Sequence, residues 1–321
     1  MSAGVLPAER IEAARVRLAG MAHLTPILTS RLLDERYGLH LGLKAENLQR
    51  AGAFKFRGAY NLVSQLAERG VRRGVVTASS GNHGGAVALA ARMTGLAAHI
   101  VVPSDASPAK IAAAEAYGAT VERVGPKSAE RLLRAEQLAA EDGWDYVPPY
   151  DHPEVLAGQA TVGLEILQQV PDVEVILVPI GGGGLISGIA TAVKAARPSV
   201  RVIGVEPEGS AAAFLSRQAG RRLAIPAGIT IADGLRTVVP GELTYPMIER
   251  LVDDLVTVSD AAIVQALILL LTHVKTVVEP SGAAAAAYAW QRPSPLAGTR
   301  TVAVLSGGNV APSVLAQLLS A

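Results

Sequence analysis

Apolar and polar residues along this chain follow patterns that predict strands and helices in regular alternation. Over residues 74–151, the pattern predicts strands at 74–79, 97–103, 119–125 and 144–149, with helices at 82–95, 108–117 and 128–142 between them. Strands separated by single helices pair in parallel, because a right-handed crossover returns the chain to the same sheet. This block has the length of a small α/β domain.

A second alternating block begins after residue 152. It predicts strands at 173–180, 200–206, 251–259 and 300–306, and helices at 154–169, 185–196, 260–275, 281–290 and 311–319. The first 73 residues add a helix from Pro7 to Gly20, a short helix that begins after Ser30, a strand at 39–47 and a helix at 58–69. Residues 209–241 are rich in proline and glycine, which predicts loops and short helices.

These patterns together predict an α/β fold with two parallel-sheet domains and flanking helices. We expect residues 74–151 to form a small α/β domain, inserted into a large discontinuous domain made of residues 1–73 and 152–321. Ligands bind at the carboxyl ends of strands in such sheets, so a site is expected in the cleft between the domains.

Composition narrows the class of protein. Half of the 321 residues are hydrophobic, 18% are charged and the net charge is +1, which fits a compact protein without a nucleic-acid or membrane partner. There are no cysteines, so disulfides and thiolate chemistry are excluded. The apolar segment 261–278 is interrupted by Gln265, His273 and Lys275, which indicates a buried helix rather than a membrane span, and the expected location is cytoplasmic.

Lys55 is the first candidate for chemistry. It is one of only six lysines, and Phe54 and Phe56 flank it. Desolvation by the two rings would lower the pKa of the amine and favour the neutral, nucleophilic form. The alternative is a structural lysine whose aliphatic stem covers apolar surface while its charge reaches water.

Glycine-rich turns follow several predicted strands and precede helices. The turn Ser79-Ser80-Gly81-Asn82-His83-Gly84 offers amides and hydroxyls that suit a carboxylate, or it merely caps the next helix. The run Gly181-Gly182-Gly183-Gly184-Leu185 allows backbone amides to close on a phosphate. Ser306-Gly307-Gly308-Asn309 reads as a turn, and Glu279-Pro280-Ser281-Gly282 as a helix entry with Ser281 as its cap.

Other classes of site find little support. The glycine run matches a dinucleotide fingerprint poorly because Ile186 replaces the third small residue, although Glu206 could mimic the acid that binds ribose. No histidine pair has the spacing of zinc ligands, and no G-x-S-x-G hydrolase motif is present.

The motifs AFKFRGAYN, SSGNHGGAVA, PIGGGGLISG, EPSGA and LSGGN occur in this order over nearly the whole chain. In this combination the sequence resembles the fold-type II pyridoxal-phosphate enzymes, whose fold is that of the tryptophan synthase β subunit. The branch that it resembles contains threonine/serine dehydratases and serine racemases.

The resemblance implies a role for each matching residue. Lys55 would hold pyridoxal 5'-phosphate through its amine, Asn82 would bond the phenolic oxygen and Ser306 would face the pyridine nitrogen. The other implied cofactor contacts are Phe54, Gly181, Gly182, Gly183, Gly184, Leu185, Gly234 and Glu279. The implied substrate contacts are Ser79, Ser80, Gly81, Asn82, His83 and Arg131.

The resemblance also implies a reaction. Lys55 would remove the α-proton of a β-hydroxy amino acid such as L-threonine or L-serine, and loss of the hydroxyl would lead to a 2-oxo acid and ammonia. Ser306 is a weak partner for the ring nitrogen, and Tyr150 follows the dehydratase pattern, so elimination is expected to dominate. The alternatives are an amino-acid racemase that uses Ser80 on the opposite face, a dehydratase of 3-hydroxyaspartate or a bulkier substrate, and a non-catalytic phosphate-ligand binder.

Two further expectations follow from the same resemblance. The protein would be a homodimer or homotetramer. A divalent cation such as Mg²⁺ would bind at Glu206 and the carbonyl of Ser210, but Ala212 stands where a further acidic ligand is expected. The sequence therefore predicts a weak or absent cation site.

Overall fold

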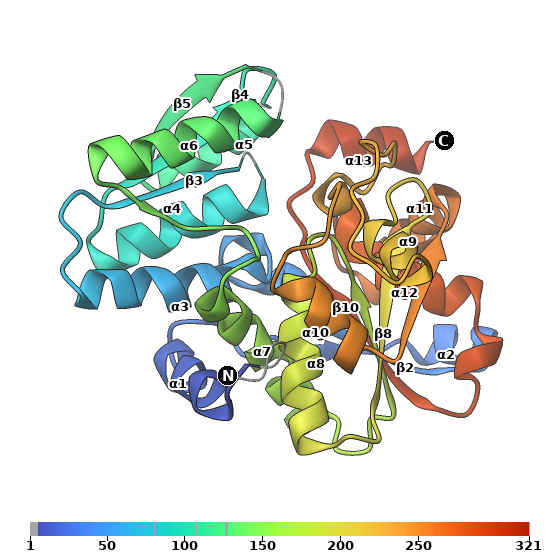
Figure 1. Ribbon diagram of the computed structural model, residues 1–321. Helices are drawn as coiled ribbons and strands as arrows, with labels where there is room; N and C mark the ends of the chain where they lie inside the picture. Colours follow the sequence, from blue (N-terminus) through green and yellow to red (C-terminus); the bar gives the residue numbers. More distant parts are fainter. Residues whose placement is uncertain (1–5, 80, 107, 126–127, 321) are drawn as a thin grey trace.

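Two sheets organise the computed structural model of the protein, which describes residues 6–79, 81–106, 108–125 and 128–320 (Figure 1). Within these residues, the larger sheet has six strands in the order β1-β2-β10-β7-β8-β9 and the smaller has four in the order β5-β4-β3-β6. The pairs between neighbouring strands are parallel, except that β1 runs antiparallel to β2. The α/β class and the two parallel-sheet units confirm the fold predicted from the sequence.

The strands of the larger sheet are β1 (Ile27–Leu28), β2 (His40–Ala45), β7 (Val175–Pro179), β8 (Arg201–Pro207), β9 (Asp254–Val258) and β10 (Arg300–Leu305). Those of the smaller sheet are β3 (Val75–Ala78), β4 (Ala98–Pro103), β5 (Thr120–Val124) and β6 (Asp145–Tyr146). The helices are α1 (Ala8–Leu18), α2 (Arg31–Tyr37), α3 (Lys55–Glu68), α4 (Asn82–Thr94), α5 (Pro108–Ala116), α6 (Ser128–Asp142), α7 (Pro153–Gln169), α8 (Gly184–Ala196), α9 (Ala212–Gln218), α10 (Thr244–Leu251), α11 (Asp260–Leu269), α12 (Pro280–Gln291) and α13 (Pro312–Leu319).

Helices cover both faces of the larger sheet (Figure 1). Successive residues of a strand point to opposite faces. In β7, Leu177 packs in the cluster that includes α11 and α12, while Ile176 and Val178 pack in the cluster that includes α7, α8 and α10. The strands are therefore apolar on both faces, as expected for a parallel sheet between helical layers.

The smaller sheet is packed in the same way. Val75 and Ile100 contribute to a cluster with α4 and α5, whereas Val76 and Val101 pack against α6. The first of these clusters also contains Phe56 and other residues of α3, which lie before the boundary predicted at residue 74. The predicted domain boundaries at residues 73/74 and 151/152 therefore stay a prediction.

Some elements differ from the sequence-based expectation. Helix α3 begins at Lys55 rather than Gly58, so the lysine lies on its first turn. Strand β9 begins at Asp254, because the preceding residues end helix α10, which the pattern did not separate from the loops. None of the helices in the described ranges is long and apolar enough to cross a membrane.

Strand order brings three chain segments to one edge of the larger sheet. Strand β10 pairs with β2 on one side and with β7 on the other. The carboxyl ends of these three neighbours lead to the Lys55 segment, to Ser306 and to residues 181–184. Parallel strands end at the same edge, so segments that are far apart in sequence meet there.

Candidate active site

A cavity of about 520 Å³ lies where the larger and the smaller sheet face each other. Its walls come from the carboxyl ends of strands in both sheets and from the loop around residues 227–238. The residues predicted from the sequence that line it are Phe54, Lys55, Ser79, Gly81, Asn82, His83, Arg131, Gly181, Gly182, Gly183, Gly184, Leu185, Gly234, Glu279 and Ser306. Ser80 lies outside the described residues.

Lys55 begins α3 and faces this cavity. Its Nζ donates a hydrogen bond of 2.6 Å to the carbonyl oxygen of Pro149 and lies 5.1 Å from the centre of the Phe54 ring. Burial lowers the pKa of the amine to about 8. This environment favours a reactive amine over a lysine that reaches out to water.

The expectation that two rings flank the amine is wrong for Phe56. That side chain is fully buried among the residues of α3, α4 and the smaller sheet, and its ring lies 5.5 Å from that of Tyr60. Consecutive residues of a helix point about 100° apart, so the start of α3 at Lys55 sends the two neighbours of the lysine in different directions.

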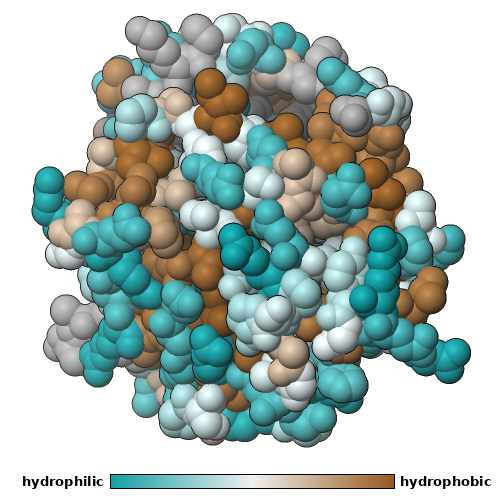
Figure 2. All heavy atoms as spheres, turned by 90° about the vertical axis from the view of Figure 1, so that its right-hand side faces the viewer, coloured by the Kyte–Doolittle hydropathy of each residue, from teal (hydrophilic) through white to brown (hydrophobic). Residues whose placement is uncertain are grey.

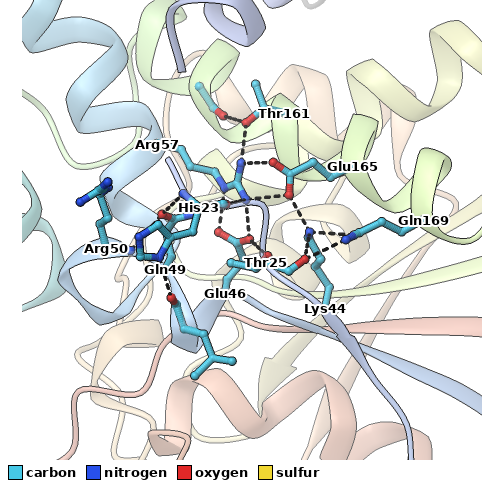
Figure 3. Close-up of polar contacts among 12 residues, drawn as sticks. His23, Thr25, Lys44, Glu46, Gln49, Arg50, Arg57, Thr161, Glu165 and Gln169 are labelled. Carbon is cyan, nitrogen blue, oxygen red and sulfur yellow. Dashed lines mark hydrogen bonds and ion pairs between the residues drawn. The ribbon is translucent and has the colours of Figure 1, made fainter. Parts of the chain in front are cut away.

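A buried network of charges surrounds Arg57, which lies close to Lys55 on the same helix (Figure 3). Arg57, two residues further along α3, donates to both carboxylate oxygens of Glu46 at 2.8 and 2.7 Å and to those of Glu165 at 2.6 and 2.8 Å. Burial raises the pKa of Glu46, but the Arg57 guanidinium more than offsets this and holds it below its ordinary value. Arg57 thus joins the first turn of α3 to the end of β2 and to α7.

Lys44 completes the network from β2. Its Nζ donates to Glu165 at 2.6 Å, to Gln169 at 2.9 Å and to the carbonyl oxygen of Thr25 at 2.7 Å. Burial lowers the pKa of Lys44 despite the nearby carboxylates. The side chains of Lys44, Glu46 and Arg57 are almost completely buried, so each charge depends on its partners.

The glycine loop, residues 181–184, connects β7 to α8. Gly183 has a φ of +94°, which favours glycine, and α8 then begins at Gly184 with its free amides toward the cavity end. A Cβ on Gly182 would lie 2.3 Å from the Tyr150 ring, so this glycine allows the tyrosine to pack over the loop. The Thr244 hydroxyl donates to the Gly182 carbonyl at 2.6 Å and holds the loop against α10.

The turn between β3 and α4 forms the opposite wall. The Ser79 hydroxyl accepts a hydrogen bond of 3.3 Å from the Gly81 amide, and Asn82 begins α4. His83 is buried, and one ring nitrogen, Nε2, lies 2.9 Å from the carbonyl oxygen of Val147. Burial, and next the charge of Lys55, lower the pKa of His83 to about 3, so the ring is neutral and Nε2 donates to that carbonyl.

The turns before α12 and after β10 meet the Lys55 segment. The Phe54 amide donates to the Ser306 carbonyl at 3.1 Å, and the Glu279 amide donates to the Gly307 carbonyl at 3.0 Å. Ser281 was expected to cap α12, but its hydroxyl instead accepts a hydrogen bond of 2.8 Å from the Gly234 amide. It thereby fixes the Gly234 loop against the cavity.

Arg131 reaches the cavity from α6. Burial lowers its pKa, while the nearby Asp105 and Tyr146 act in the opposite direction. A guanidinium in this position can bind a carboxylate. Its role in substrate binding stays a prediction.

Glu206 and Ser210 do not line the cavity. The Glu206 carboxylate accepts hydrogen bonds of 3.0 and 2.7 Å from the Ala213 and Phe214 amides at the start of α9. Each Glu206 oxygen accepts one amide, and Ala212 adds no carboxylate. No cluster of three metal-ligating side chains occurs among the described residues, and the weak or absent cation site stays a prediction. Glu206 lies outside the cavity, so it gives no support to the dinucleotide alternative.

Sequence reasoning missed several residues of this site. Thr244 and Asn309 bind backbone carbonyls of the loops, and the Asp151 carboxylate accepts amides of residues 242–244 at the start of α10. Only the LSGGN motif, which ends at Asn309, gave any signal in the sequence. Hydrogen bonds between loops depend on chain segments whose proximity a linear sequence does not show.

The chain resembles known proteins over nearly its whole length. The sequence profile of the family described as "Pyridoxal-phosphate dependent enzyme" matches residues 20–307. The L-threo-3-hydroxyaspartate ammonia-lyase of Saccharomyces cerevisiae is 42% identical over 95% of this chain and 93% of its own length. The L-threonine ammonia-lyase of Geobacter sulfurreducens is 43% identical over 95% of this chain and 76% of its own. The solved structure of maize serine racemase has a TM-score of 0.93 at 39% identity and covers 100% of this chain and 98% of that one.

Proposed function

Because the chain belongs to the family of pyridoxal-phosphate-dependent enzymes, we propose that it is an ammonia-lyase of β-hydroxy amino acids such as L-threonine or L-serine. The products are a 2-oxo acid and ammonia. The observation that carries this proposal is Lys55, an amine with a pKa near 8 in the same cavity as the glycine loop.

The residues of the cavity fit the cofactor. The glycine loop offers backbone amides at the start of α8, and a Cβ on Gly182 or Gly184 would collide with Tyr150. Such a cradle suits a phosphate group. Asn82 offers a side-chain N–H and Ser306 a buried hydroxyl in the same cavity. When bound, pyridoxal phosphate draws electrons from the substrate and makes its α-proton acidic.

Residues of the chain itself move the proton and orient the substrate. Nζ of Lys55, neutral above its lowered pKa, accepts the α-proton. The amides and hydroxyl of the Ser79 turn and the Arg131 guanidinium orient the substrate carboxylate groups. The neutral His83 ring adds no positive charge beside Lys55. Burial alone therefore lowers the pKa of the amine.

A racemase is the second candidate, because the relatives include serine racemases from rice and maize. The resemblance implies that in that reaction Ser80 would exchange a proton on the substrate face opposite the one that Lys55 serves. Elimination needs only the lysine and a departing β-hydroxyl group. A neutral Ser306 hydroxyl beside the bound cofactor would make that cofactor a weaker electron sink, which favours elimination.

The test measures ammonia and 2-oxo acid release from L-threonine, L-serine and L-threo-3-hydroxyaspartate, with chiral analysis of the remaining amino acid. We expect oxo acid to exceed D-enantiomer for at least one substrate. Ser80→Ala should remove the D-enantiomer and retain most elimination. Rapid formation of D-enantiomer with little oxo acid would instead assign a racemase.

The cytoplasmic location and the homodimer or homotetramer stay predictions. Large apolar side chains such as Leu24, Leu32 and Ile229 are exposed, and Figure 2 shows apolar patches between hydrophilic residues on one face of the molecule. Exposed apolar surface of this kind is compatible with contacts between subunits. Light scattering on the holoenzyme measures the subunit number.

A further inference from the structure

We propose that Asn309 is a positioning residue that determines which end of the Asn82 amide faces the cofactor. This inference rests on the proposed function, since it concerns the cofactor site. Asn309 follows β10 in the LSGGN turn, and it does not line the cavity itself. It acts through two hydrogen bonds from its side-chain nitrogen.

The first step is the orientation of Asn309. Its Nδ2 lies 2.7 Å from the carbonyl oxygen of Ala51 and 2.8 Å from Oδ1 of Asn82. A backbone carbonyl can only accept a hydrogen bond. The group of Asn309 that faces Ala51 must therefore be the NH₂ group, and its second hydrogen points at Asn82.

The orientation of Asn82 follows from that of Asn309. The atom of Asn82 that faces the NH₂ group must be an acceptor, which is Oδ1. Nδ2 of Asn82 then lies on the other side, where it donates to Oε1 of Glu279 at 2.6 Å. Of its two hydrogens, one serves Glu279 and the other has no partner among the described residues.

The turn before Lys55 is shaped to make this possible. Ala51 has a φ of +54°, which is uncommon for alanine, and Gly52 follows with +71°. A Cβ on Gly52 would lie 2.3 Å from Oδ1 of Asn309. The Gly308 amide donates to the Gly52 carbonyl at 2.9 Å and keeps the two turns together.

The consequence is a fixed donor in the cavity. With this orientation, the second N–H of Asn82 would be available to an oxygen of the bound cofactor. With the amide reversed, Oδ1 would face both the Glu279 carboxylate and that oxygen, so that acceptors would face acceptors. A backbone carbonyl four residues before Lys55 thus sets the polarity of a side chain on α4.

The test is Asn309→Asp, which keeps the shape but removes both donors. A carboxylate at this position would accept from Nδ2 of Asn82 and reverse the amide. We expect the affinity of the apoprotein for pyridoxal phosphate to fall at least tenfold and the pH midpoint of the visible band of the lysine-bound cofactor to shift. Asn309→Ala, which loses the two bonds without adding charge, should weaken binding less.

Asn47→Asp is the matched control. Nδ2 of Asn47 likewise donates to one side chain, Thr276 at 2.8 Å, and to one carbonyl, Val277 at 3.0 Å, in a buried turn nearby. Neither of these hydrogen bonds involves Asn82, so the Asn47→Asp variant should lower the melting temperature without moving the pH midpoint.

Equal midpoints for wild type, Asn309→Asp and Asn309→Ala would overturn the positioning role, as would an equal shift in the Asn47→Asp control. Measurements on the wild-type protein distinguish a failure of this proposal from a failure of the proposed lyase activity. A normal cofactor band without oxo acid release would contradict the lyase, while a shift confined to the Asn309 variants would still support the positioning role.

Discussion

At the scale of single residues, the reactivity of the site depends on how much water reaches one amine. The pKa of Lys55 is lowered to about 8 because burial disfavours its charged form. Only the neutral amine attacks the aldehyde of the cofactor. The rate at which the cofactor attaches to Lys55 should therefore depend on the fraction of the amine that is neutral.

We predict that the initial rate at which the apoprotein acquires the visible cofactor band rises with pH and levels off above about 8. The sign follows from the titration, since the nucleophilic form grows as pH passes the lowered pKa. Stopped-flow absorbance from pH 6 to 10 measures it. Lys55→Ala should show no band at any pH and no turnover; a rate still rising steeply at pH 10 would mean an ordinary lysine.

The candidate residues could be predicted because their chemistry is local, whereas their partners could not. The sequence identified Lys55 and the glycine loop, and the structure brings them into one cavity. The sequence did not predict that Phe56 packs into the core or that the Ser281 hydroxyl accepts a hydrogen bond from the Gly234 amide. Those contacts depend on where a helix begins and on which loops meet.

At the scale of elements, the position of Lys55 depends on the position of α3, because Lys55 is the first residue of that helix. The Arg57 guanidinium holds the first turn of α3 between Glu46 and Glu165 (Figure 3). If the arginine is removed, the buried Glu46 carboxylate is left without its main countercharge. Breaking a buried pair in this way typically costs about 3–5 kcal/mol.

We predict that Arg57→Met lowers the free energy of unfolding by about 3 kcal/mol or more, measured by urea denaturation at pH 7. The control is Arg31→Met. Arg31 pairs with Glu35 at 3.4 Å on the exposed face of α2, and loss of such a pair costs less than about 1 kcal/mol. Equal losses in the two variants would show that the buried network contributes little.

Most elements were predictable from hydrophobic periodicity, and the exceptions have identifiable causes. Leu251, which ends α10, and Val252 lie just before β9, and these two apolar residues were read as the start of that strand. Strand β1 has two residues, too few for any alternating pattern. Helix α3 starts earlier than expected because Phe54 already has helical dihedral angles and its carbonyl oxygen accepts a hydrogen bond from the Arg57 amide.

At the scale of the whole molecule, the cavity is walled by both sheets, so its ligand contacts two units at once. A ligand that binds only the folded protein stabilises it in proportion to the logarithm of its concentration. The stabilisation is about 4 kcal/mol when free cofactor exceeds the dissociation constant 1,000-fold. Neither the strand order nor the insertion of β10 between β2 and β7 could be read from the sequence, because pairing between distant strands leaves no local pattern.

We predict that removal of pyridoxal phosphate lowers the melting temperature, and that the temperature rises again as cofactor is added back. Differential scanning calorimetry on holoprotein and apoprotein measures both. Free phosphate at the same concentration is the control and should restore only part of the change. A melting temperature independent of cofactor would contradict a ligand shared by the two units.

The place of β10 in the larger sheet also sets an order in time. The four strands of the smaller sheet are made consecutively and can assemble while the ribosome is still adding residues. Strand β2 must wait for β10, which is made only after all the other strands of both sheets, before the central pairing exists. Until then, the turn before Lys55 also lacks the Ser306 and Gly308 contacts that hold it. Until β10 is made, a nascent chain therefore exposes apolar strand edges, and we expect it to bind the cofactor only after β10 has joined the sheet.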